Sequence, residues 1–369
     1  MKVAFDISIL DFDRAGSATY ARQILEHVEK MDGVEAVIPL RSGAGAGGAL
    51  TRRLRHLWQD LLWSPFLSPV LAARRGADIL HCTAYRAPLL SGLPRVVTIH
   101  DVYPLQNPGS FRLWWAWYFR WFVAAAAARA DCVITSSAIS AREICSSWGI
   151  DETRVRVIHY GVGAVFERPP APAQVARVRR EQGLPPRYFL FVGSLEPRKN
   201  FSGLLAAARE LRQAGRDCRL VMVGPRGWRN RTLQEEVAGA TEEGWVSSLG
   251  FVRDEDLAAL YAGARALVMP SLHEGFGFPI IEAMGCGCPV IAGRAGSLPE
   301  IAGDAGLVVD PGDTAAIAAA MARVDDDDAL HADLTRRGRE RAGRFRWERC
   351  ARETVELYRE LLDRTNAAT

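Results

Sequence analysis

Two carboxylates, Glu274 and Glu282, stand with seven residues between them around a glycine-rich stretch in the last third of the chain. Ionised carboxylates accept hydrogen bonds, so they can orient the hydroxyl groups of a bound ligand. Gly275 and Gly277 carry no Cβ, which lets the backbone approach a ligand closely and turn its N–H groups outward. We therefore expect this stretch to bind an anion or a ring of sugar hydroxyls.

A strand, a turn and a helix must position these groups. Residues 266–269 form a short apolar run typical of a buried parallel strand, which Pro270 and Ser271 end. Residues 278–284 have helical character, so Glu274 falls in the loop and Glu282 in the helix. The positive N-terminal end of that helix would add to the attraction for an anion.

A second candidate cluster is basic. Residues 188–192 predict a strand, the loop 193–200 begins at Gly193, and residues 201–213 predict a helix. Arg198 and Lys199 therefore stand just ahead of a helix N-terminus. Two positive side chains and free N–H groups can converge there on a diphosphate.

The first half of the chain offers further candidates at strand ends. Residues 2–9 predict a strand and the helix 18–29 follows, so we expect Gly16 and Ser17 in a ligand loop between them. His100 ends the strand that begins at residue 95. Asp11 and Asp13 could hold a divalent cation, but they come after only one strand, and a solvated loop pair is the better interpretation.

Strands and helices alternate along the whole chain, which predicts mostly parallel sheets covered on both faces. The remaining strands are expected at 34–39, within 78–89 where the strand ends in a loop, and at 132–136, 154–158, 219–224, 246–252, 289–292 and 306–309. Prolines between 168 and 186 predict a linker between two domains, at 1–168 and 187–345, with a last helix at 346–369. No Gly-x-Gly-x-x-Gly follows the first strand of either domain, which disfavours a nicotinamide dehydrogenase.

The length and composition of the chain limit its possible domain count and location. The 369 residues are enough for two cores, and no apolar run approaches the roughly 20 residues of a membrane-spanning helix. We see no signal peptide and expect a cytoplasmic protein. Seven scattered cysteines predict reduced, buried thiols, and Cys286 and Cys288 lack the second pair that a zinc site needs. We expect no metal, no cofactor and no nucleic acid partner.

Two segments combine basic and aromatic residues on a helical frame. The first runs from Arg52 to Trp63, where a helix packed on the sheet is an equally good interpretation. The second runs from residue 111 to 122, where aromatic rings suit a lipid headgroup boundary. The side chains expected to touch a membrane there are Arg112, Trp114, Trp115, Trp117, Arg120 and Trp121.

Residues 270–292 have the sequence Pro-Ser-Leu-His-Glu-Gly-Phe-Gly-Phe-Pro-Ile-Ile-Glu-Ala-Met-Gly-Cys-Gly-Cys-Pro-Val-Ile-Ala. This stretch resembles the donor-site signature of retaining GT-B glycosyltransferases of family four. The resemblance extends over almost the whole chain. It implies two doubly wound α/β (Rossmann-like) domains facing each other across a cleft, with the last helix returning to the first domain. The acceptor would bind mainly to the first domain and the nucleotide sugar to the second.

The resemblance also assigns roles. Arg198 and Lys199 would bind the donor diphosphate, Glu274 the sugar hydroxyls and Glu282 the ribose, with His100 near the reacting centre. Further donor contacts would come from Gly16, Ser17, Gly193 and Val252, and from the backbone of Gly275, Phe276, Gly277 and Phe278. The chain departs from the family pattern at Ser17-Ala18, at Gly163 and at Gly193-Ser194.

Three stretches look closest to mannosyltransferases of bacterial surface polysaccharide assembly: Tyr85-Arg-Ala-Pro-Leu, Thr98-Ile-His-Asp and Leu298-Pro-Glu-Ile-Ala-Gly-Asp-Ala-Gly. They suggest GDP-mannose, or a GDP-deoxyhexose made from it, as donor. The acceptor would be a lipid-linked glycan at the inner face of the cytoplasmic membrane. A UDP-sugar donor, a GT-B sugar-nucleotide epimerase and a non-catalytic sugar-nucleotide sensor remain alternatives.

Overall fold

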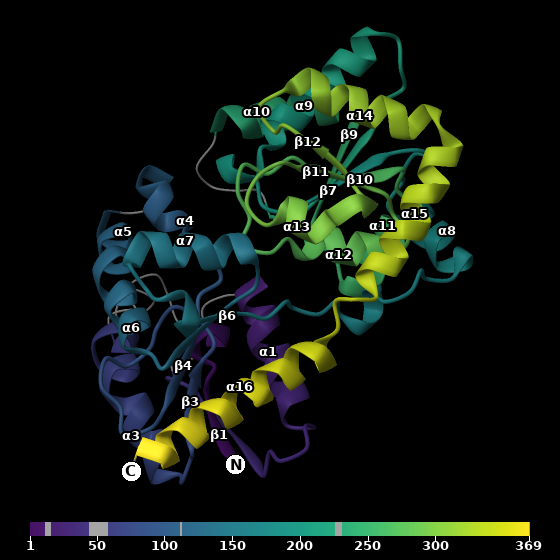
Figure 1. Ribbon diagram of the computed structural model, residues 1–369. Helices are drawn as coiled ribbons and strands as arrows, with labels where there is room; N and C mark the ends of the chain where they lie inside the picture. Colours follow the sequence, from purple (N-terminus) through teal and green to yellow (C-terminus); the bar gives the residue numbers. More distant parts are fainter. Residues whose placement is uncertain (12–15, 44–57, 111–112, 226–230, 369) are drawn as a thin grey trace. The chain divides into compact units, whose positions relative to one another are not determined.

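A computed structural model describes residues 1–11, 16–43, 58–110, 113–225 and 231–368 (Figure 1). The chain divides into two compact units. Unit 1 comprises Met1–Gly161 together with Arg346–Thr369, and unit 2 comprises Val162–Phe345.

Unit 1 is built on a six-stranded parallel sheet with the order β2-β1-β3-β4-β5-β6. Its strands are β1 (Lys2–Asp6), β2 (Ala36–Leu40), β3 (Ile79–Cys82), β4 (Arg95–Thr98), β5 (Cys132–Thr135) and β6 (Val155–Val157). All four residues of β3 and of β5 are buried, as expected of central strands covered on both faces.

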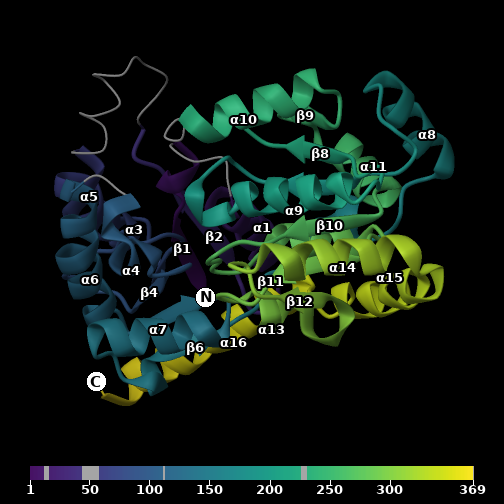
Figure 2. The ribbon, with the colours of Figure 1, turned by 90° about the horizontal axis from the view of Figure 1, so that it is seen from above.

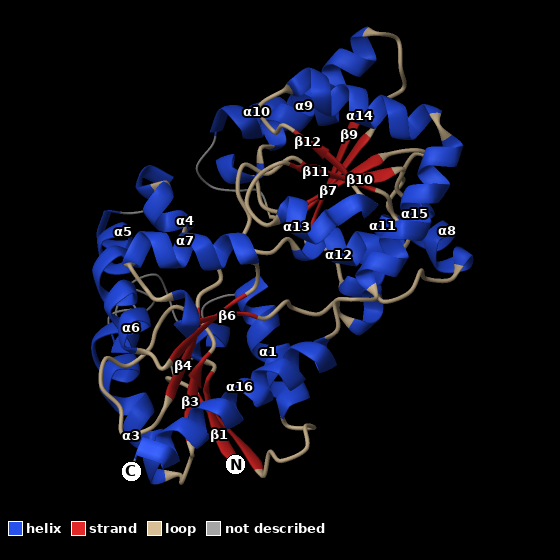
Figure 3. Cartoon of the chain, in the orientation of Figure 1, coloured by secondary structure: helices blue, strands red, loops and turns tan. Residues whose placement is uncertain are grey.

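Helices cover both faces of this sheet, as Figure 3 shows. The described helices of unit 1 are α1 (Gly16–Val28), the π-helix η2 (Gln59–Leu67), α3 (Ser68–Arg74), α4 (Tyr103–Gln106), α5 (Leu113–Tyr118), the π-helix η4 (Phe119–Val123), α6 (Ala124–Arg129), α7 (Ala138–Trp148) and α16 (Trp347–Ala368). Trp63, Phe119 and Ile144 bring η2, η4 and α7 onto one core cluster with the strands. The helices α1 and α16 pack against each other.

A buried polar contact joins the last helix to the centre of the sheet. His81 on β3 contacts the Tyr358 hydroxyl on α16 through Nδ1 at 2.5 Å and the Thr98 hydroxyl through Nε2 at 2.8 Å. Burial, and secondarily the nearby His100, lower the pKa of His81 to about 3, so the ring is neutral. The C-terminal helix thus belongs to the packing of unit 1, as the sequence predicted.

Unit 2 repeats the architecture with the order β12-β11-β10-β7-β8-β9, again with every pair parallel. Its strands are β7 (Phe189–Val192), β8 (Leu220–Val223), β9 (Val246–Gly250), β10 (Ala266–Met269), β11 (Val290–Gly293) and β12 (Leu307–Val309). Its described helices are α8 (Pro172–Glu181), α9 (Phe201–Gln213), α10 (Arg231–Glu242), α11 (Asp254–Gly263), α12 (Phe278–Gly285), α13 (Leu298–Ala302), α14 (Thr314–Asp326) and α15 (Asp328–Ala342). Figure 2 shows α9 and α14 running alongside each other, and their apolar sides meet the sheet in one core cluster.

Two boundaries differ from the sequence prediction. The helix α1 begins at Gly16, so Gly16 and Ser17 lie in its first turn rather than in a loop. The division between the units falls after Gly161, ahead of the proline-rich segment. The reason is local packing in unit 2: the Val162 N–H donates to the Phe345 carbonyl at 3.1 Å, and the Phe166 ring packs edge-on against Tyr261.

Candidate functional site

The strand order of unit 2 creates a switch point between β7 and β10. The chain runs from β7 outward to β8 and β9 and then returns to the other side of β7 to form β10. Loops that leave neighbouring strands in opposite directions open a crevice at their carboxyl ends, which is where ligands of such sheets bind. The loop after β7 carries Arg198 and Lys199, and the loop after β10 carries Glu274.

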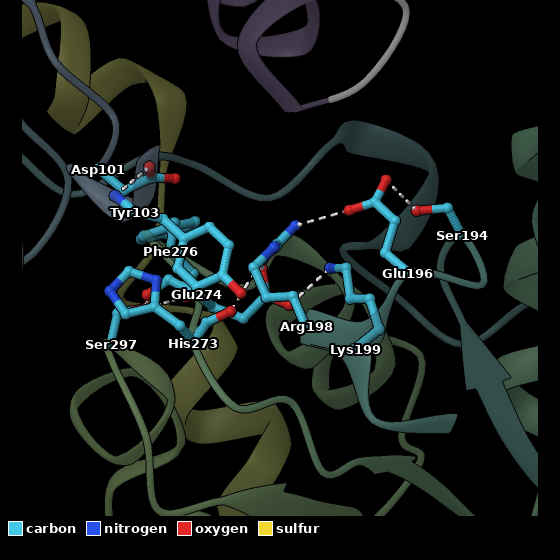
Figure 4. A network of polar contacts seen from close by, with 10 residues as sticks. All are labelled: Asp101, Tyr103, Ser194, Glu196, Arg198, Lys199, His273, Glu274, Phe276 and Ser297. Carbon is cyan, nitrogen blue, oxygen red and sulfur yellow. Dashed lines mark hydrogen bonds and ion pairs between the residues drawn. The ribbon is translucent and has the colours of Figure 1, made fainter. Parts of the chain in front are cut away.

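The two loops are joined by an ionic triad. Glu274 accepts from Lys199 Nζ through Oε1 at 2.6 Å and from Arg198 Nη1 through Oε2 at 2.7 Å (Figure 4). Arg198 Nη1 also donates to the His273 carbonyl at 2.8 Å. The resemblance assigned all three side chains to the donor site, and the structure shows a direct contact between them that the sequence analysis did not predict.

The triad is anchored on one side by a second carboxylate. Glu196 lies 3.7 Å from Arg198 Nη2 and accepts a hydrogen bond from the Ser194 hydroxyl at 2.8 Å (Figure 4). Its side chain is half exposed, so this outer contact is weak compared with the buried pair.

The charge state of Glu274 is set by its neighbours. Its side chain is only 8% exposed, and burial by itself would raise the pKa of the carboxyl. The positive charges of Lys199 and then Arg198 outweigh that effect and lower the pKa of Glu274 to about 2. Glu274 is therefore ionised at every physiological pH, and the triad carries a net positive charge of one.

Two residues that the sequence analysis did not single out hold these loops. Ser297 donates from its hydroxyl to the carbonyls of Glu274 and Phe276, at 3.0 and 2.9 Å, and is fully buried. Gly296 permits that approach, because a Cβ at this position would lie 2.5 Å from the Glu274 carbonyl oxygen. A Gly-Ser pair after a predicted strand is too common in sequences to have indicated this role.

Asn200 shapes the other loop. It adopts a left-handed backbone with φ of 53°, caps α9 by accepting from the Gly203 N–H, and donates to the Pro311 carbonyl at 2.7 Å. Asn tolerates this backbone conformation and is a favoured N-cap. The sequence signal was present, since an Asn stands directly before the apolar helix.

The glycine-rich loop continues into α12. Gly277 is its N-cap with φ of 95°, a conformation that a side chain would strain. The Phe276 ring packs against Phe278 and Phe345, so its side chain belongs to the core of unit 2. The Phe276 backbone remains a candidate for ligand contact.

Glu282 lies one turn into α12 and receives a hydrogen bond from the fully buried Tyr261 hydroxyl at 2.9 Å. Burial raises the pKa of Glu282 to about 7; the Tyr261 bond lowers it in part, and the charge of Asp254 adds to the increase. Glu282 and Glu274 therefore sit in opposite electrostatic environments although they share one loop and helix.

The two remaining donor candidates of unit 2 lie on either side of β8. The Gly193 N–H donates to the Val223 carbonyl at 2.9 Å, and its Cα faces the Lys199 side chain. Val252 follows β9, which is two strands away from β7 at the edge of the sheet. The sheet thus places Gly193 beside the triad and Val252 away from it.

In unit 1, His100 lies just beyond the carboxyl end of β4 and is buried. Its Nδ1 contacts the Tyr160 hydroxyl at 2.6 Å. Burial lowers the pKa of His100 to about 4, with the Thr83 backbone acting in the opposite direction. Gly16 and Ser17, the other candidates of this unit, stand at the N-terminus of α1.

The aromatic segment presents a defined outer face. Trp114 is 49% exposed, Trp117 and Trp121 are each 58% exposed, and Phe122 accompanies them; we call these four residues the aromatic face. The Arg120 guanidinium lies over the Trp121 ring, 6.0 Å from its centroid. The Trp115 ring is partly buried against the core of unit 1, with the Arg86 guanidinium over it, so it is not part of the aromatic face. Arg112 lies outside the described residues.

Among the described residues, no three His, Cys, Asp or Glu side chains are grouped so that they could hold a metal ion. Likewise, no helix in the described part of the chain has the length and apolar character needed to cross a membrane.

Comparisons with known families and structures agree with this geometry. Residues 15–164 match the family described as Glycosyltransferase Family 4, and residues 174–341 match the family described as Glycosyl transferases group 1. Sucrose-phosphate synthase from Thermosynechococcus elongatus superposes with a TM-score of 0.78 at 24% identity, with all of both chains covered. That likeness establishes the fold, which is GT-B.

Two curated relatives are closer in sequence. "O-antigen chain mannosyltransferase B" of Escherichia coli is 37% identical over 232 residues, which are 62% of this chain and 61% of the relative. "O-antigen chain mannosyltransferase RfbU" of Salmonella typhimurium is 28% identical over 277 residues, 74% of this chain and 72% of the relative. The chain thus spans about six tenths of the length of the first of these relatives. Unit 1 thus contains a domain of Glycosyltransferase Family 4, and unit 2 contains a domain of the Glycosyl transferases group 1.

Proposed function

We propose that the protein is a metal-independent, retaining hexosyltransferase that uses a nucleotide sugar as donor. The observation that carries the proposal is the triad at the switch point of unit 2, where Glu274 holds Arg198 and Lys199 at 2.7 and 2.6 Å. Unit 2 would bind the nucleotide sugar, and unit 1 the acceptor.

The triad suits the charge changes of glycosyl transfer. When the bond between the anomeric carbon and the diphosphate breaks, its electron pair stays with the diphosphate, and positive character develops on the sugar. The acceptor hydroxyl oxygen then forms the new bond to that carbon and loses its proton to the departing diphosphate. Arg198 and Lys199 are fixed in advance where negative charge would grow, which is the condition under which such groups stabilise a transition state most.

Glu274 has two functions in this proposal. In the ligand-free protein it holds Arg198 and Lys199 in place. The side chains of these two residues are only 21% and 12% exposed. With donor bound, its ionised carboxylate would accept hydrogen bonds from the sugar hydroxyls while the cations turn part of their charge to the diphosphate. Glu282 would accept from the ribose in its ionised form.

The donor is proposed to be GDP-mannose or a GDP-deoxyhexose. The names of the Escherichia coli and Salmonella typhimurium relatives support a mannosyl group. The acceptor is proposed to be a lipid-linked saccharide of surface polysaccharide assembly. Its lipid would be reached from the inner surface of the cytoplasmic membrane, to which the aromatic face would attach the protein from the cytoplasmic side.

A panel of nucleotide sugars tests the proposal. Purified protein is incubated with each donor, with and without a mannose-terminated acceptor, and the release of nucleoside diphosphate is measured. We expect release that depends on acceptor and is fastest with a GDP-sugar, and a product whose anomeric configuration matches the donor. Fastest release from a UDP-sugar would reassign the donor, an isomerised donor without acceptor would indicate an epimerase, and binding without any turnover would indicate a sensor.

A further inference from the structure

The ring of His100 is fixed by a cluster of aromatic side chains in unit 1. Tyr20 and Tyr85 meet it edge-on, with centroids at 5.5 and 5.7 Å, and Tyr160 does so at 5.8 Å. Of these three, Tyr160 makes the hydrogen bond, from its hydroxyl to Nδ1 at 2.6 Å. The aromatic packing fixes the plane of the imidazole, but it does not determine which ring nitrogen carries the proton.

The length of that hydrogen bond and the strengths of the two donors decide its direction. A phenol O–H is a stronger donor than a neutral imidazole N–H, and 2.6 Å is shorter than the usual range of N–H···O bonds. Burial raises the pKa of Tyr160 well above its usual value, so the phenol keeps its own proton. The proton of Tyr160 therefore points at Nδ1 of His100.

A neutral imidazole has one N–H and one acceptor nitrogen. If Nδ1 accepts from Tyr160, Nε2 must carry the proton. Nε2 is buried and makes no hydrogen bond of normal geometry with the residues that the structure describes, although the Thr83 backbone lies near enough to raise the pKa of the ring.

We propose that Tyr160 is a positioning residue that holds His100 in the tautomer with its proton on Nε2, so that His100 presents a neutral hydrogen-bond donor to an oxygen of the substrate. The inference rests on the proposed function for its consequence in turnover, but the tautomer itself is a property of the ligand-free protein. A buried N–H without a partner costs free energy, and a ligand oxygen that pairs with it recovers that cost.

Tyr160 is held in turn by the start of the C-terminal helix. Its ring stacks on Trp347, the first residue of α16, with centroids 6.0 Å apart and an interplanar angle of 12°. Next to Tyr160, Gly161 leaves room for this contact, because a Cβ there would lie 2.2 Å from the Trp347 backbone nitrogen. The last helix thereby supports the tautomer through one aromatic stack.

The tautomer can be read directly. The full chain is labelled with 15N-histidine and its ring nitrogens are observed by NMR at pH 7, with His100 assigned by comparison with a His100→Gln variant. The unprotonated nitrogen of a neutral imidazole resonates far downfield of the protonated one. We expect His100 in the wild-type protein to show a protonated Nε2, and a protonated Nδ1 would overturn the proposal without any variant.

The variant Tyr160→Phe removes the hydroxyl and keeps the ring that stacks on Trp347. We expect it to mix the two tautomers of His100 and to lower kcat about 10-fold with little change in the donor KM. Tyr20→Phe is the matched control, since it removes a hydroxyl from the same cluster that bonds Thr98 at 3.1 Å rather than His100. This control should leave the tautomer unchanged.

The results distinguish a failure of the proposed role of Tyr160 from a failure of the proposed function. An unchanged His100 tautomer in Tyr160→Phe, or equal losses of kcat in both variants, would show that Tyr160 only packs. If the protein transfers no sugar at all, the proposed function fails, and the NMR result still decides the assignment of the tautomer. Should Tyr160→Phe not fold, the wild-type spectrum alone decides, since a protonated Nδ1 overturns the proposal.

Discussion

Lys199 and Glu274, 75 residues apart in the sequence, are joined by a hydrogen-bonded ion pair of 2.6 Å that links the two loops at the switch point of unit 2. Both side chains are largely buried, so the pair is screened far less than a surface ion pair. Arg198 shares the same carboxylate. Both cationic side chains are thereby held in place before any ligand arrives.

Replacing Lys199 by alanine should lower kcat by about 10²- to 10³-fold, the scale found for one preorganised stabilising group. The diphosphate gains charge as the bond breaks, so the loss should be larger in kcat than in the donor KM. Steady-state kinetics with varied donor measures both. Lys30→Ala is the control, because that exposed lysine, just past the end of α1, pairs with Glu26 on the surface. An unchanged kcat in Lys199→Ala would show that the loop does not contact the leaving group.

Activity should persist in excess EDTA, because cationic side chains take the place of a metal in the proposed mechanism. The measurement compares nucleoside diphosphate release before and after dialysis against the chelator. Complete loss that Mn²⁺ restores would contradict the mechanism and direct attention to Asp11 and Asp13, the latter outside the described residues.

Stability should respond to the protonation of Glu282. Its pKa is about 7 in the folded protein against an ordinary value of 4.5, so between these values the folded state binds more protons than the unfolded state. Stability therefore falls as pH rises through this window, and the cost is complete above pH 7. Glu282→Gln should be more stable than the wild type at pH 8, by roughly 1–3 kcal/mol, and about equal to it near pH 4.

Urea unfolding at the two pH values, followed by circular dichroism, measures this difference. Glu242→Gln, at an exposed position near the end of α10, controls for the loss of one negative charge. If Glu282→Gln lowers the free energy of unfolding equally at both pH values, the ionised Glu282 carboxylate is stabilised by its surroundings in the folded protein.

The purified protein should bind vesicles that contain anionic lipid through the aromatic face. Trp114 and Trp117 supply apolar contact, and each basic residue near the surface adds about 1 kcal/mol that salt screens. Binding should weaken, but persist, at high ionic strength. Replacing both residues by serine should release the protein from vesicles in a sedimentation assay while sparing turnover of a short water-soluble acceptor.

Phe251→Ser provides a control, since Phe251 is the most exposed of the large apolar side chains that the structure describes and lies in unit 2. It should leave vesicle binding unchanged. Because Trp114 and Trp117 are about half exposed, their replacement should not unfold unit 1. Retained binding in the double variant would assign the membrane contact to another surface, such as the exposed Leu62 and Phe66 of η2.

The twelve described strands all lie where the sequence predicts them, because buried parallel strands are continuous apolar runs bounded by turn residues. The members of the triad were predictable, because Arg198, Lys199 and Glu274 stand in loops after such strands and the carboxyl ends of parallel strands meet at one edge of a sheet. Their ion pairs were not predictable, because the sequence does not show that β7 and β10 are neighbours.

Other features depended on three-dimensional packing. The core of unit 1 decides which rings of the aromatic run face inward, namely Phe119 and, in part, Trp115 and Tyr118, and the composition of the run gives no sign of this. The contacts of Tyr160 with His100 and with Trp347 join residues that are 60 and 187 positions apart, which no local pattern encodes. Arg52, Arg53 and Arg55, part of the first basic segment, lie outside the described residues.

The pairing of Val162 with Phe345, whose backbones are hydrogen bonded at 3.1 Å, brings both ends of unit 2 together. Unit 2 is thus a continuous insertion within unit 1, whose sheet and last helix come from opposite ends of the chain. During synthesis on the ribosome, unit 2 has all of its residues before unit 1 does, because His81 receives Tyr358 only after the final segment has emerged. The order in which the two units complete their folding is therefore the reverse of the order in which they begin.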